Sequence, residues 1–435
     1  MKYITLSKEL YIENRRKFCA KMQPGSIAII VSNDELNKNG DGLHDYKQSS
    51  DMLWLTGMDQ EDTWLMLFPD CPNPDFREVL YIKETSETIA IWHGHKHSKE
   101  EATALSGIVN VELNSKFEAA LHPAMILAQH CYLNLNENDR ATIVSENADL
   151  RFVRRLMTKF PLHTYHRSAP ILQRLRAIKH PEEMKAIRKA IEIVGMSFER
   201  VMKFIKPGVM EYEVEAETIH EFIRNGATGN SFQPIVASGA SACVLHYVEN
   251  NRPLKDGDLL LLDHGCEYAN YCSDLTRVMP VNGKFTARQK EVYDAVLRLQ
   301  RQAMSMLKPN VIIMDYHQEM GKYITEECIA LGLLTKEEVR DENPKWPAYK
   351  KYCVHGISHF LGLDVHDVGM RWEPLQAGMV LTCEPGIYIQ EEGIGIRIEN
   401  DVLITASGCE DLMQNFVIET GQIEEVMGKV NLVAS

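Results

Sequence analysis

Residues 259–280, LLLLDHGCEYANYCSDLTRVMP, decide the fold of the C-terminal half of this chain. The apolar run that begins this stretch ends in Asp263, and Asp274 opens a second, alternating segment after the turn-like sequence GCEYANYC. Two apolar runs joined by a short polar connection are typical of paired strands. The pattern therefore predicts two neighbouring strands whose acidic side chains point into one cleft.

Three further segments carry candidate site residues. His359 lies in HGISHFLGLDVHDVG, which is too rich in glycine and histidine for an ordinary amphipathic helix and is predicted to be a loop. Glu384 lies in GMVLTCEPGIYI and Glu399 in GIGIRIENDVLIT, two β-rich segments that we expect to pair as neighbouring strands. Because apolar strands flank nearly all of these groups, the acids are expected to be buried, and buried carboxylates must be paired or bind metal.

Four carboxylates and one imidazole are the ligand set expected for two divalent metals that share a water. Carboxylates bridge two cations about 3.5 Å apart, and one neutral imidazole completes a coordination shell without adding charge. This mixture of oxygen and nitrogen suits Mn, Co or Zn better than Ca. A bridging water loses a proton near neutral pH and becomes a nucleophile. The set therefore favours metal-assisted hydrolysis.

The blocks DHGCEY, SDLTR, HGISHFLGLDVHDVG, EPGIYI and GIRIEND resemble the signature blocks of the Xaa-Pro aminopeptidases, which are metallopeptidases of the pita-bread fold. They occur in the order found in that family, and the resemblance extends from the N-terminal helix to about residue 405. It implies an α/β N-terminal domain followed by an α+β pita-bread catalytic domain. It also implies an enzyme that uses a metal-bridging hydroxide to release the first residue from peptides with proline second.

The resemblance assigns the metal site residue by residue. Two divalent ions, Mn before Co or Zn, would be held by five ligands, with Asp274 and Glu399 as the bridging pair. The ligands implied are Asp263, Asp274, His359, Glu384 and Glu399.

Three other residues match substrate or catalytic positions of the family, and one of the ligands is expected to have a second role. His246, in CVLHYVEN, matches a histidine that faces the substrate, with a hydrogen-bonded strand histidine as the alternative. His355 and His366 match histidines that bind the substrate carbonyl and stabilise the tetrahedral intermediate, where donors oppose developing oxyanion charge. Glu384 is also expected to ferry a proton from the nucleophilic water to the leaving amine.

A second group is implied to support the site. Arg397 alternates with Glu399 along one strand, so both are expected to face the cleft, and it resembles an arginine that supports the site network. Tyr388 is a weaker candidate for the same role. Asp364 and Asp367 are interpreted as supporting or turn residues.

Proline specificity requires an apolar surface for a φ-locked ring. Trp92, in IAIWHGHKH, matches a tryptophan that reaches the proline pocket in the family, often that of a neighbouring subunit. An ordinary strand-end aromatic is the alternative. His93, His95 and His97 alternate in the same segment and suggest a separate metal tract, but three histidines on a predicted exposed loop are usually solvated, and we interpret them so.

The amino-acid composition limits the possible binding partners and the cellular compartment of the protein. The formal net charge of −14 argues against nucleic acid or anionic membranes as partners. The ten cysteines contain no CxxC pair, which favours a reducing compartment. The N-terminus lacks the apolar region of a signal peptide, and no apolar run is long enough to span a bilayer. We therefore expect a soluble cytoplasmic protein. The resemblance implies that it acts on proline-containing peptides, and it suggests a homodimer or homotetramer assembled through the N-terminal domains.

The first part of the chain alternates helical and strand patterns, as α/β domains do. Helices are expected over residues 7–22, 98–104, 116–130 and 147–159, and strands over 26–31, 52–57, 64–68, 79–82 and 132–135. A boundary is expected within 167–181, which divides the chain into domains 1–172 and 173–435. Three helices, at 181–205, 211–225 and 286–307, are predicted to cover the strands that bear the ligands.

Several alternatives compete with the aminopeptidase. A prolidase, which cleaves Xaa-Pro dipeptides, shares nearly the same metal blocks and is the main alternative. The compact run between Glu384 and Glu399 leaves little room for a loop that would cap the cleft and reject longer peptides, which favours the aminopeptidase. Methionine aminopeptidases usually lack so large an N-terminal domain. A partner-binding pseudoenzyme and creatinase-like metal-free hydrolysis both conflict with a complete ligand set.

Overall fold

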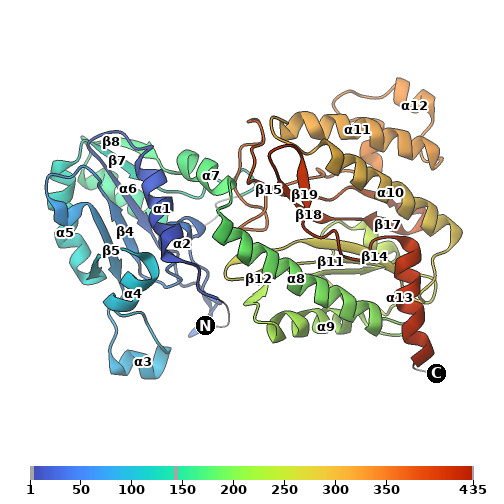
Figure 1. Ribbon diagram of the computed structural model, residues 1–435, viewed down its shortest axis with the longest axis horizontal. Coiled ribbons are helices and arrows are strands. Elements are labelled where there is room, and N and C mark those ends of the chain that lie inside the picture. The colour runs from blue at the N-terminus through green and yellow to red at the C-terminus, as the bar shows by residue number, and fades with distance from the viewer. Residues whose placement is uncertain (1–3, 142–145, 434–435) are drawn as a thin grey trace. The chain divides into compact units, whose positions relative to one another are not determined.

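The computed structural model describes residues 4–141 and 146–433. The chain forms two compact units, Thr5–Arg176 and a second that begins at Ala177. This division lies inside the stretch 167–181. The two units are described separately below (Figure 1).

A six-stranded mixed sheet forms the centre of the N-terminal unit. Its strands run in the order β6-β5-β4-β1-β7-β8. The central strand β1 pairs antiparallel with β4 and parallel with β7, and its six residues are all buried. The bounds are β1 (Ser26–Val31), β4 (Trp64–Leu67), β5 (Glu78–Ile82), β6 (Asn110–Leu113), β7 (His130–Leu133) and β8 (Thr164–Arg167); β2 (Asn37–Asn39) and β3 (Gly42–Leu43) form a separate hairpin.

Helices pack against this sheet and bury its apolar residues. Phe117 of α5 and Phe152 of α6 join Ile27 and Ile29 of β1 in one core, while α2 contacts β1 and packs with α1 and α4. The sequence periodicity predicted α1, α4, α5 and α6 to within a few residues. The bounds are α1 (Lys8–Cys19), α2 (Ser50–Thr56), α3 (Glu87–His93), α4 (Lys99–Ser106), α5 (Phe117–Leu127), α6 (Ala148–Lys159) and α7 (Ala169–Ala177).

The strand predicted at 52–57 is wrong, because this segment is helix α2. All five residues from Met52 to Thr56 are buried. The spacing of apolar residues therefore cannot distinguish a helix from a buried strand in this run. The signal that marks the helix is Gly57, which adopts φ 72° and donates its N–H to the Leu53 carbonyl at 2.7 Å. A left-handed glycine immediately after a short apolar run is a typical helix C-terminus.

Antiparallel strands carry the candidate ligands in the C-terminal unit. β11 lies between β10 and β14, and β18 lies between β15 and β19. The predicted pairings are confirmed, since β11 pairs with β14, β15 with β18, and β16 with β17. The bounds are β9 (Gly229–Asn230), β10 (Ile235–Ser238), β11 (Leu259–His264), β12 (Cys266–Tyr268), β13 (Tyr271–Cys272), β14 (Leu275–Pro280), β15 (Val380–Cys383), β16 (Gly386–Ile389), β17 (Ile394–Arg397), β18 (Asn400–Ile404) and β19 (Cys409–Asp411).

Helices cover both sides of this strand layer. In Figure 1, α8 and α9 lie on one side of it and α10 and α11 on the other. α8 begins with His180 as its cap and Pro181 at its first position, and it ends just before the Lys-Pro-Gly sequence at 206–208. The predicted helices at 181–205, 211–225 and 286–307 are confirmed. The bounds are α8 (Pro181–Phe204), α9 (Glu211–Arg224), α10 (Ala287–Met306), α11 (Ile313–Ala330), α12 (Lys336–Arg340) and α13 (Thr420–Val433).

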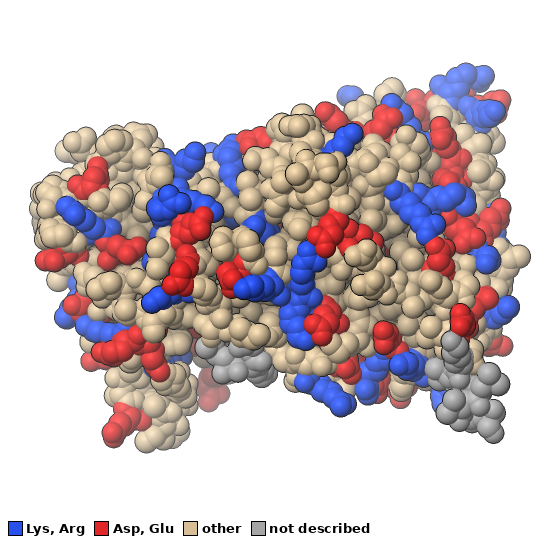
Figure 2. Space-filling view, in the orientation of Figure 1, with Lys and Arg blue, Asp and Glu red and all other residues tan. Residues whose placement is uncertain are grey.

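Two surface properties bear on the expected partners. Within the described ranges, no helix is both long and apolar enough to cross a bilayer. On the face shown in Figure 2, basic and acidic side chains are interspersed. Some oppositely charged side chains at the surface form ion pairs, such as that between Arg288 and Glu392 at 2.8 Å.

Candidate metal and catalytic site

The strand pair β11 and β14 positions the first two acids. Asp263 lies directly opposite Thr276 in this antiparallel pair, and directly opposed residues project to the same face of a sheet. Asp274 lies two residues before Thr276, so it faces the same way. The two acids and the threonine therefore share one side of the sheet, as the sequence pattern predicted for the acids.

The second pair of acids comes from the junctions of the other strands. Cys383 of β15 pairs with Asn400 of β18, so Glu384, which follows Cys383, and Glu399, which precedes Asn400, lie at the same end of that pair. The backbone N–H of Glu399 donates to the Thr276 carbonyl at 3.2 Å. This bond joins the two ligand-bearing sheets.

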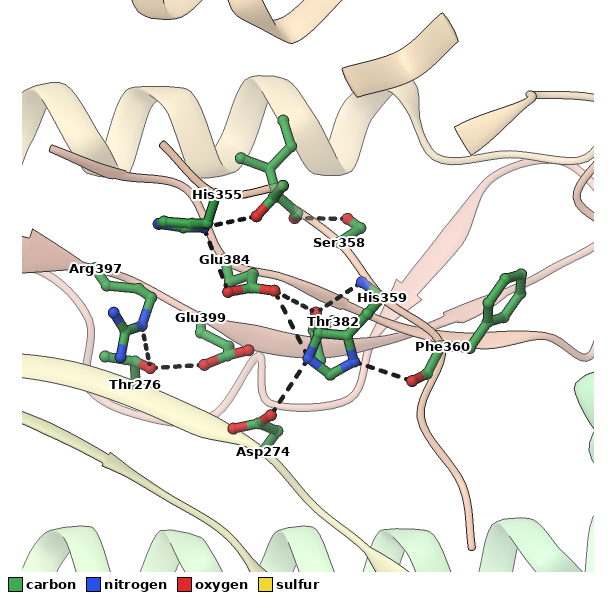
Figure 3. A network of polar contacts seen from close by, with 12 residues as sticks. Asp274, Thr276, His355, Ser358, His359, Phe360, Thr382, Glu384, Arg397 and Glu399 are labelled. Carbon is green, nitrogen blue, oxygen red and sulfur yellow. Dashed lines mark hydrogen bonds and ion pairs between the residues drawn. The ribbon is translucent and has the colours of Figure 1, made fainter. Parts of the chain in front are cut away.

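His359 points its ring toward Asp274, Glu384 and Glu399 (Figure 3). It lies in irregular structure, as the loop prediction requires. Its Nδ1 bonds the Phe360 carbonyl at 3.0 Å, which orients the ring so that Nε2 faces the acids. Nε2 lies 3.5 Å from Asp274 Oδ2 and 3.6 Å from Glu384 Oε1.

Arg397 holds the acids from one side. Its Nη2 donates to Asp263 Oδ2 at 2.5 Å, and its Nη1 donates to the Tyr388 hydroxyl at 2.8 Å. Its Nε donates to Thr276 Oγ1 at 3.2 Å, and that hydroxyl donates to Glu399 Oε2 at 2.6 Å. One buried guanidinium therefore orients two carboxylates, one directly and one through a hydroxyl.

The same network extends to His355. Its Nδ1 lies 2.6 Å from the Gly356 carbonyl, which can only accept, so this nitrogen carries the proton. Its Nε2 lies 2.9 Å from the Tyr388 hydroxyl and therefore accepts from it. Burial, with the positive charge of Arg397, lowers the pKa of His355 to about 3, so the ring is neutral. Nδ1 also lies 3.7 Å from Glu384 Oε2.

The carboxylates repel one another strongly without a cation. Burial, reinforced by the charges of Glu399 and Asp263, raises the pKa of Asp274 well above its usual range. Burial and the charges of Glu384 and Asp263 do the same for Glu399. The Oδ1 atoms of Asp263 and Asp274 are buried and accept no hydrogen bond from the described residues.

These observations fit a metal centre. Asp274, His359 and Glu399 offer ligand atoms that all lie within 4.8 Å of one another. Divalent cations would neutralise the repulsion among the acids and use their two orphaned oxygens, since buried charges are stable only when paired or coordinated. The donor set of carboxylates with one imidazole suits such ions.

Other candidate residues lie at different distances from this centre. The His366 ring centroid is 4.5 Å from that of His359, with the two rings nearly perpendicular. His246 is exposed, yet it lies close enough to His355 for its charge to lower the pKa of that ring. Trp92 belongs to the N-terminal unit, where it is 79% exposed near the end of α3, a helix and not the strand end considered above.

Two residues at the site were not identified from the sequence pattern. Thr276 bridges Arg397 and Glu399, as described above, and Asp401 accepts from the backbone N–H of Asp274 at 3.1 Å. Thr276 lies two residues after the ligand Asp274, and Asp401 lies two residues after the ligand Glu399. Strand periodicity places such residues on the ligand face and is the signal that identifies them.

Residues 185–406 match the metallopeptidase family M24, and residues 11–132 match the aminopeptidase P, N-terminal domain. The chain belongs to metallopeptidase family M24. Its second unit thus has the predicted pita-bread fold of that family, preceded by the predicted α/β domain. The chain is 36% identical to the Xaa-Pro aminopeptidase of Escherichia coli, over 97% of this chain and 98% of that protein.

Two solved structures of the family resemble this chain over its whole length. A putative aminopeptidase P from Bacillus anthracis superposes with a TM-score of 0.90 at 32% identity, covering 98% of this chain and 99% of the other. Aminopeptidase P from E. coli with the inhibitor Pro-Leu gives a TM-score of 0.87 at 34% identity, covering 99% and 100%. These M24 proteins share both units of the present chain.

Proposed function

We propose that this protein is an Xaa-Pro aminopeptidase, a metal-dependent hydrolase that releases the first residue from peptides whose second residue is proline. The observation that carries the proposal is the convergence of four carboxylates and His359 on one buried site with orphaned oxygens. It occurs in a chain related along its full length to the E. coli Xaa-Pro aminopeptidase. The bound Pro-Leu of the E. coli structure supports a peptide with proline as the substrate class.

Five side chains would hold two divalent cations: Asp263, Asp274, His359, Glu384 and Glu399, with Asp274 and Glu399 bridging. When bound, such cations supply a water of lowered pKa and polarise a carbonyl oxygen. Manganese is the metal we propose, with cobalt or zinc as the alternatives, because the set is rich in hard oxygen donors and contains one imidazole.

Glu384 has a second role as proton carrier. Its Oε1 faces His359 and its Oε2 faces His355, at 3.6 and 3.7 Å, so it lies between the ligand cluster and the neutral histidine. A carboxylate in this position accepts a proton from the attacking water and delivers it to the nitrogen of the leaving proline. That nitrogen carries no proton in the peptide, so the delivery is required for it to leave as an amine.

The remaining polar side chains bind the substrate or orient the site. His366 stabilises the charge that develops on the scissile carbonyl oxygen. His355 does the same when its Nδ1–H turns from the Gly356 carbonyl toward the substrate, and His246 contacts the substrate. Arg397 orients Asp263 through a direct hydrogen bond, and Tyr388 links the guanidinium to His355. The roles of Arg397 and Tyr388 are supported by the distances given above, and the substrate roles of the three histidines are supported by the resemblance of their sequence blocks.

The N-terminal part, residues 1–172, serves assembly and the substrate pocket, and residues 173–435 carry catalysis. Trp92 supplies an apolar surface for the proline ring, and homodimers or homotetramers form through the N-terminal unit. The large exposed side chains of Ile91 and Trp92 on α3 support such a contact. The ten free cysteines support a reducing, cytoplasmic location. The acidic net charge supports peptides and not nucleic acid or membranes as partners.

The test is hydrolysis of a proline-second tripeptide and of the matching Xaa-Pro dipeptide by enzyme that has been chelated and reloaded with Mn2+. Release of the first residue from the tripeptide, followed by mass spectrometry, is the expected result. A matched tripeptide with alanine second should be cleaved far more slowly. Cleavage of the dipeptide alone would make the protein a prolidase and contradict the proposal.

A further inference from the structure

We propose that His95, His97 and Glu101 form a second metal site, in the N-terminal unit, for a transition-metal dication such as Zn2+. The alternating histidines of this segment were interpreted above as solvated. The structure brings two of them together with a carboxylate: each of the three offers one ligand atom, and these atoms all lie within 4.8 Å of one another. His93, the third histidine of the tract, is not in the cluster.

The spacing is close to that of a coordination shell. His95 Nε2 lies 2.9 Å from Glu101 Oε2, and the ring centroids of His95 and His97 are 5.9 Å apart. Ligand atoms about 2.0 to 2.2 Å from a tetrahedral Zn2+ are separated from each other by about 3.4 Å. Small rotations of exposed side chains therefore bring all three atoms into range. Two histidines and one carboxylate leave a fourth position for water, as in open zinc sites.

The backbone around the cluster is already fixed. Lys96 lies between the two histidines and pairs with Glu61 at 2.6 Å, so the charge of this lysine is compensated beside the proposed site. The His97 N–H donates to Gln60 Oε1 at 2.9 Å. These two contacts restrain the backbone of the segment, and binding to a partly preorganised site costs less.

Glu101 is held just as firmly at the start of α4. Ser98 and Glu101 form a capping box, in which the Ser98 N–H donates to Glu101 Oε2 at 2.8 Å and the Glu101 N–H donates to Ser98 Oγ at 3.2 Å. The carboxylate therefore already faces the histidines before any ion arrives.

The ligand chemistry separates this site from the catalytic centre. The catalytic set has four carboxylates and one imidazole, whereas this one has two imidazoles and one carboxylate. Imidazole-rich sites prefer Zn2+, Ni2+ or Cu2+ to Mn2+. A neutral imidazole offers the electron pair of one ring nitrogen to a metal, as each of these two histidines could. An ion here would tie the segment after α3 to the first turn of α4.

The experiment counts zinc in the full-length protein. Wild-type protein and the variants His95→Gln/His97→Gln and His93→Gln are loaded with Mn2+, equilibrated with Zn2+, desalted and measured by mass spectrometry of the metals. Wild type and His93→Gln are expected to hold about one more zinc per chain than the double variant. Equal zinc content in wild type and the double variant would overturn the proposal. A loss of zinc in His93→Gln as large as that in the double variant would also overturn it.

Glu101→Gln gives an independent check. Glutamine still completes a capping box, so α4 and peptidase activity should be unchanged, while the loss of a charged ligand weakens zinc binding at this site by about tenfold or more. Circular dichroism and turnover of a proline-second peptide show whether the fold is intact. Unchanged zinc affinity in a folded Glu101→Gln protein would remove the carboxylate from the site and contradict the proposal.

Discussion

Lys179 Nζ lies 2.8 Å from Asp367 Oδ2, and each of these side chains is only 1% exposed. The Asp367 N–H also donates to the Phe360 carbonyl at 2.9 Å, which closes the loop between them. His359 precedes this loop and His366 ends it. Lys179 lies near the start of the C-terminal unit, 188 positions before Asp367 in the chain. The ion pair thus holds the end of the loop that follows His359 and contains His366.

We predict that Lys179→Met destabilises the protein by about 3 to 5 kcal/mol, because it leaves the Asp367 carboxylate buried without its partner. Urea unfolding measures this change. Lys189→Met is the matched control on α8, since Lys189 pairs with Glu192 at the surface, and its effect is expected to lie within about 0.5 kcal/mol. Equal effects of the two substitutions would contradict the role of the buried pair.

The double variant Lys179→Met/Asp367→Leu separates stability from positioning. Replacing both partners of a buried ion pair by apolar groups restores much of the stability. If the pair orients His366, kcat on a proline-second peptide stays at least about tenfold low, because catalytic groups displaced by about 1 Å lose much of their effect. A stable double variant with wild-type kcat would show that the pair is structural only.

Tyr388→Phe should lower kcat about 10- to 100-fold and leave metal content unchanged. The hydroxyl accepts from Arg397 and donates to His355, and hydrogen bonds to charged groups contribute about 1.5 to 3 kcal/mol. Steady-state kinetics and metal analysis check this. Tyr247→Phe is the control, since the Tyr247 hydroxyl bonds Glu211 in a separate buried contact. A loss of metal from Tyr388→Phe would contradict the assignment.

Thr276→Val should weaken metal binding about 10- to 100-fold, the usual range for a group that orients a ligand. Valine has nearly the same volume but lacks the hydroxyl that donates to Glu399 and accepts from Arg397. Competition with a chromophoric chelator gives the affinity. Thr218→Val on α9 is the control, since its hydroxyl bonds only the Val214 carbonyl within the described residues. Equal metal affinities of Thr276→Val and wild type would rule out this role.

Asp149 should make stability fall with rising pH. Burial, with the charges of Asp51 and Asp34, raises the pKa of Asp149 to about 8, whereas an unfolded aspartate titrates near about 3.9. Between these values the native state binds a proton that the unfolded state releases, so the free energy of unfolding decreases as pH rises, by about 1.4 kcal/mol per unit. Asp149→Asn removes this slope. Denaturant unfolding between pH 5 and pH 8 measures the free energy of unfolding of wild type and of Asp149→Asn. The same dependence on pH in both proteins would refute the prediction.

The elements that bear the site could be predicted because their signals are local. The apolar run before Asp263 and the alternation after Asp274 specify β11 and β14 without any other part of the chain. Helices α8, α10 and α12 begin with capping boxes, such as that of Thr286 before α10. Local pattern failed at 52–57, where every side chain is buried and periodicity carries no information.

The contacts between distant segments could not be predicted in the same way. Nothing near Lys179 in the sequence indicates Asp367 as its partner, since the pair forms only when the loop folds against the start of α8. The cluster of His95, His97 and Glu101 is similar, because the capping box that aims Glu101 is a local signal but its convergence with the histidines depends on the backbone of residues 94–98.

The most direct test of the metal centre is a titration of chelated enzyme with Mn2+ while hydrolysis of a proline-second tripeptide is followed. Activity should be absent without metal and reach its plateau at about two bound ions per chain. Asp274→Asn, which lacks a bridging carboxylate, should fail to bind the pair and should be nearly inactive. Full activity of this variant with one metal per chain would contradict the dinuclear account.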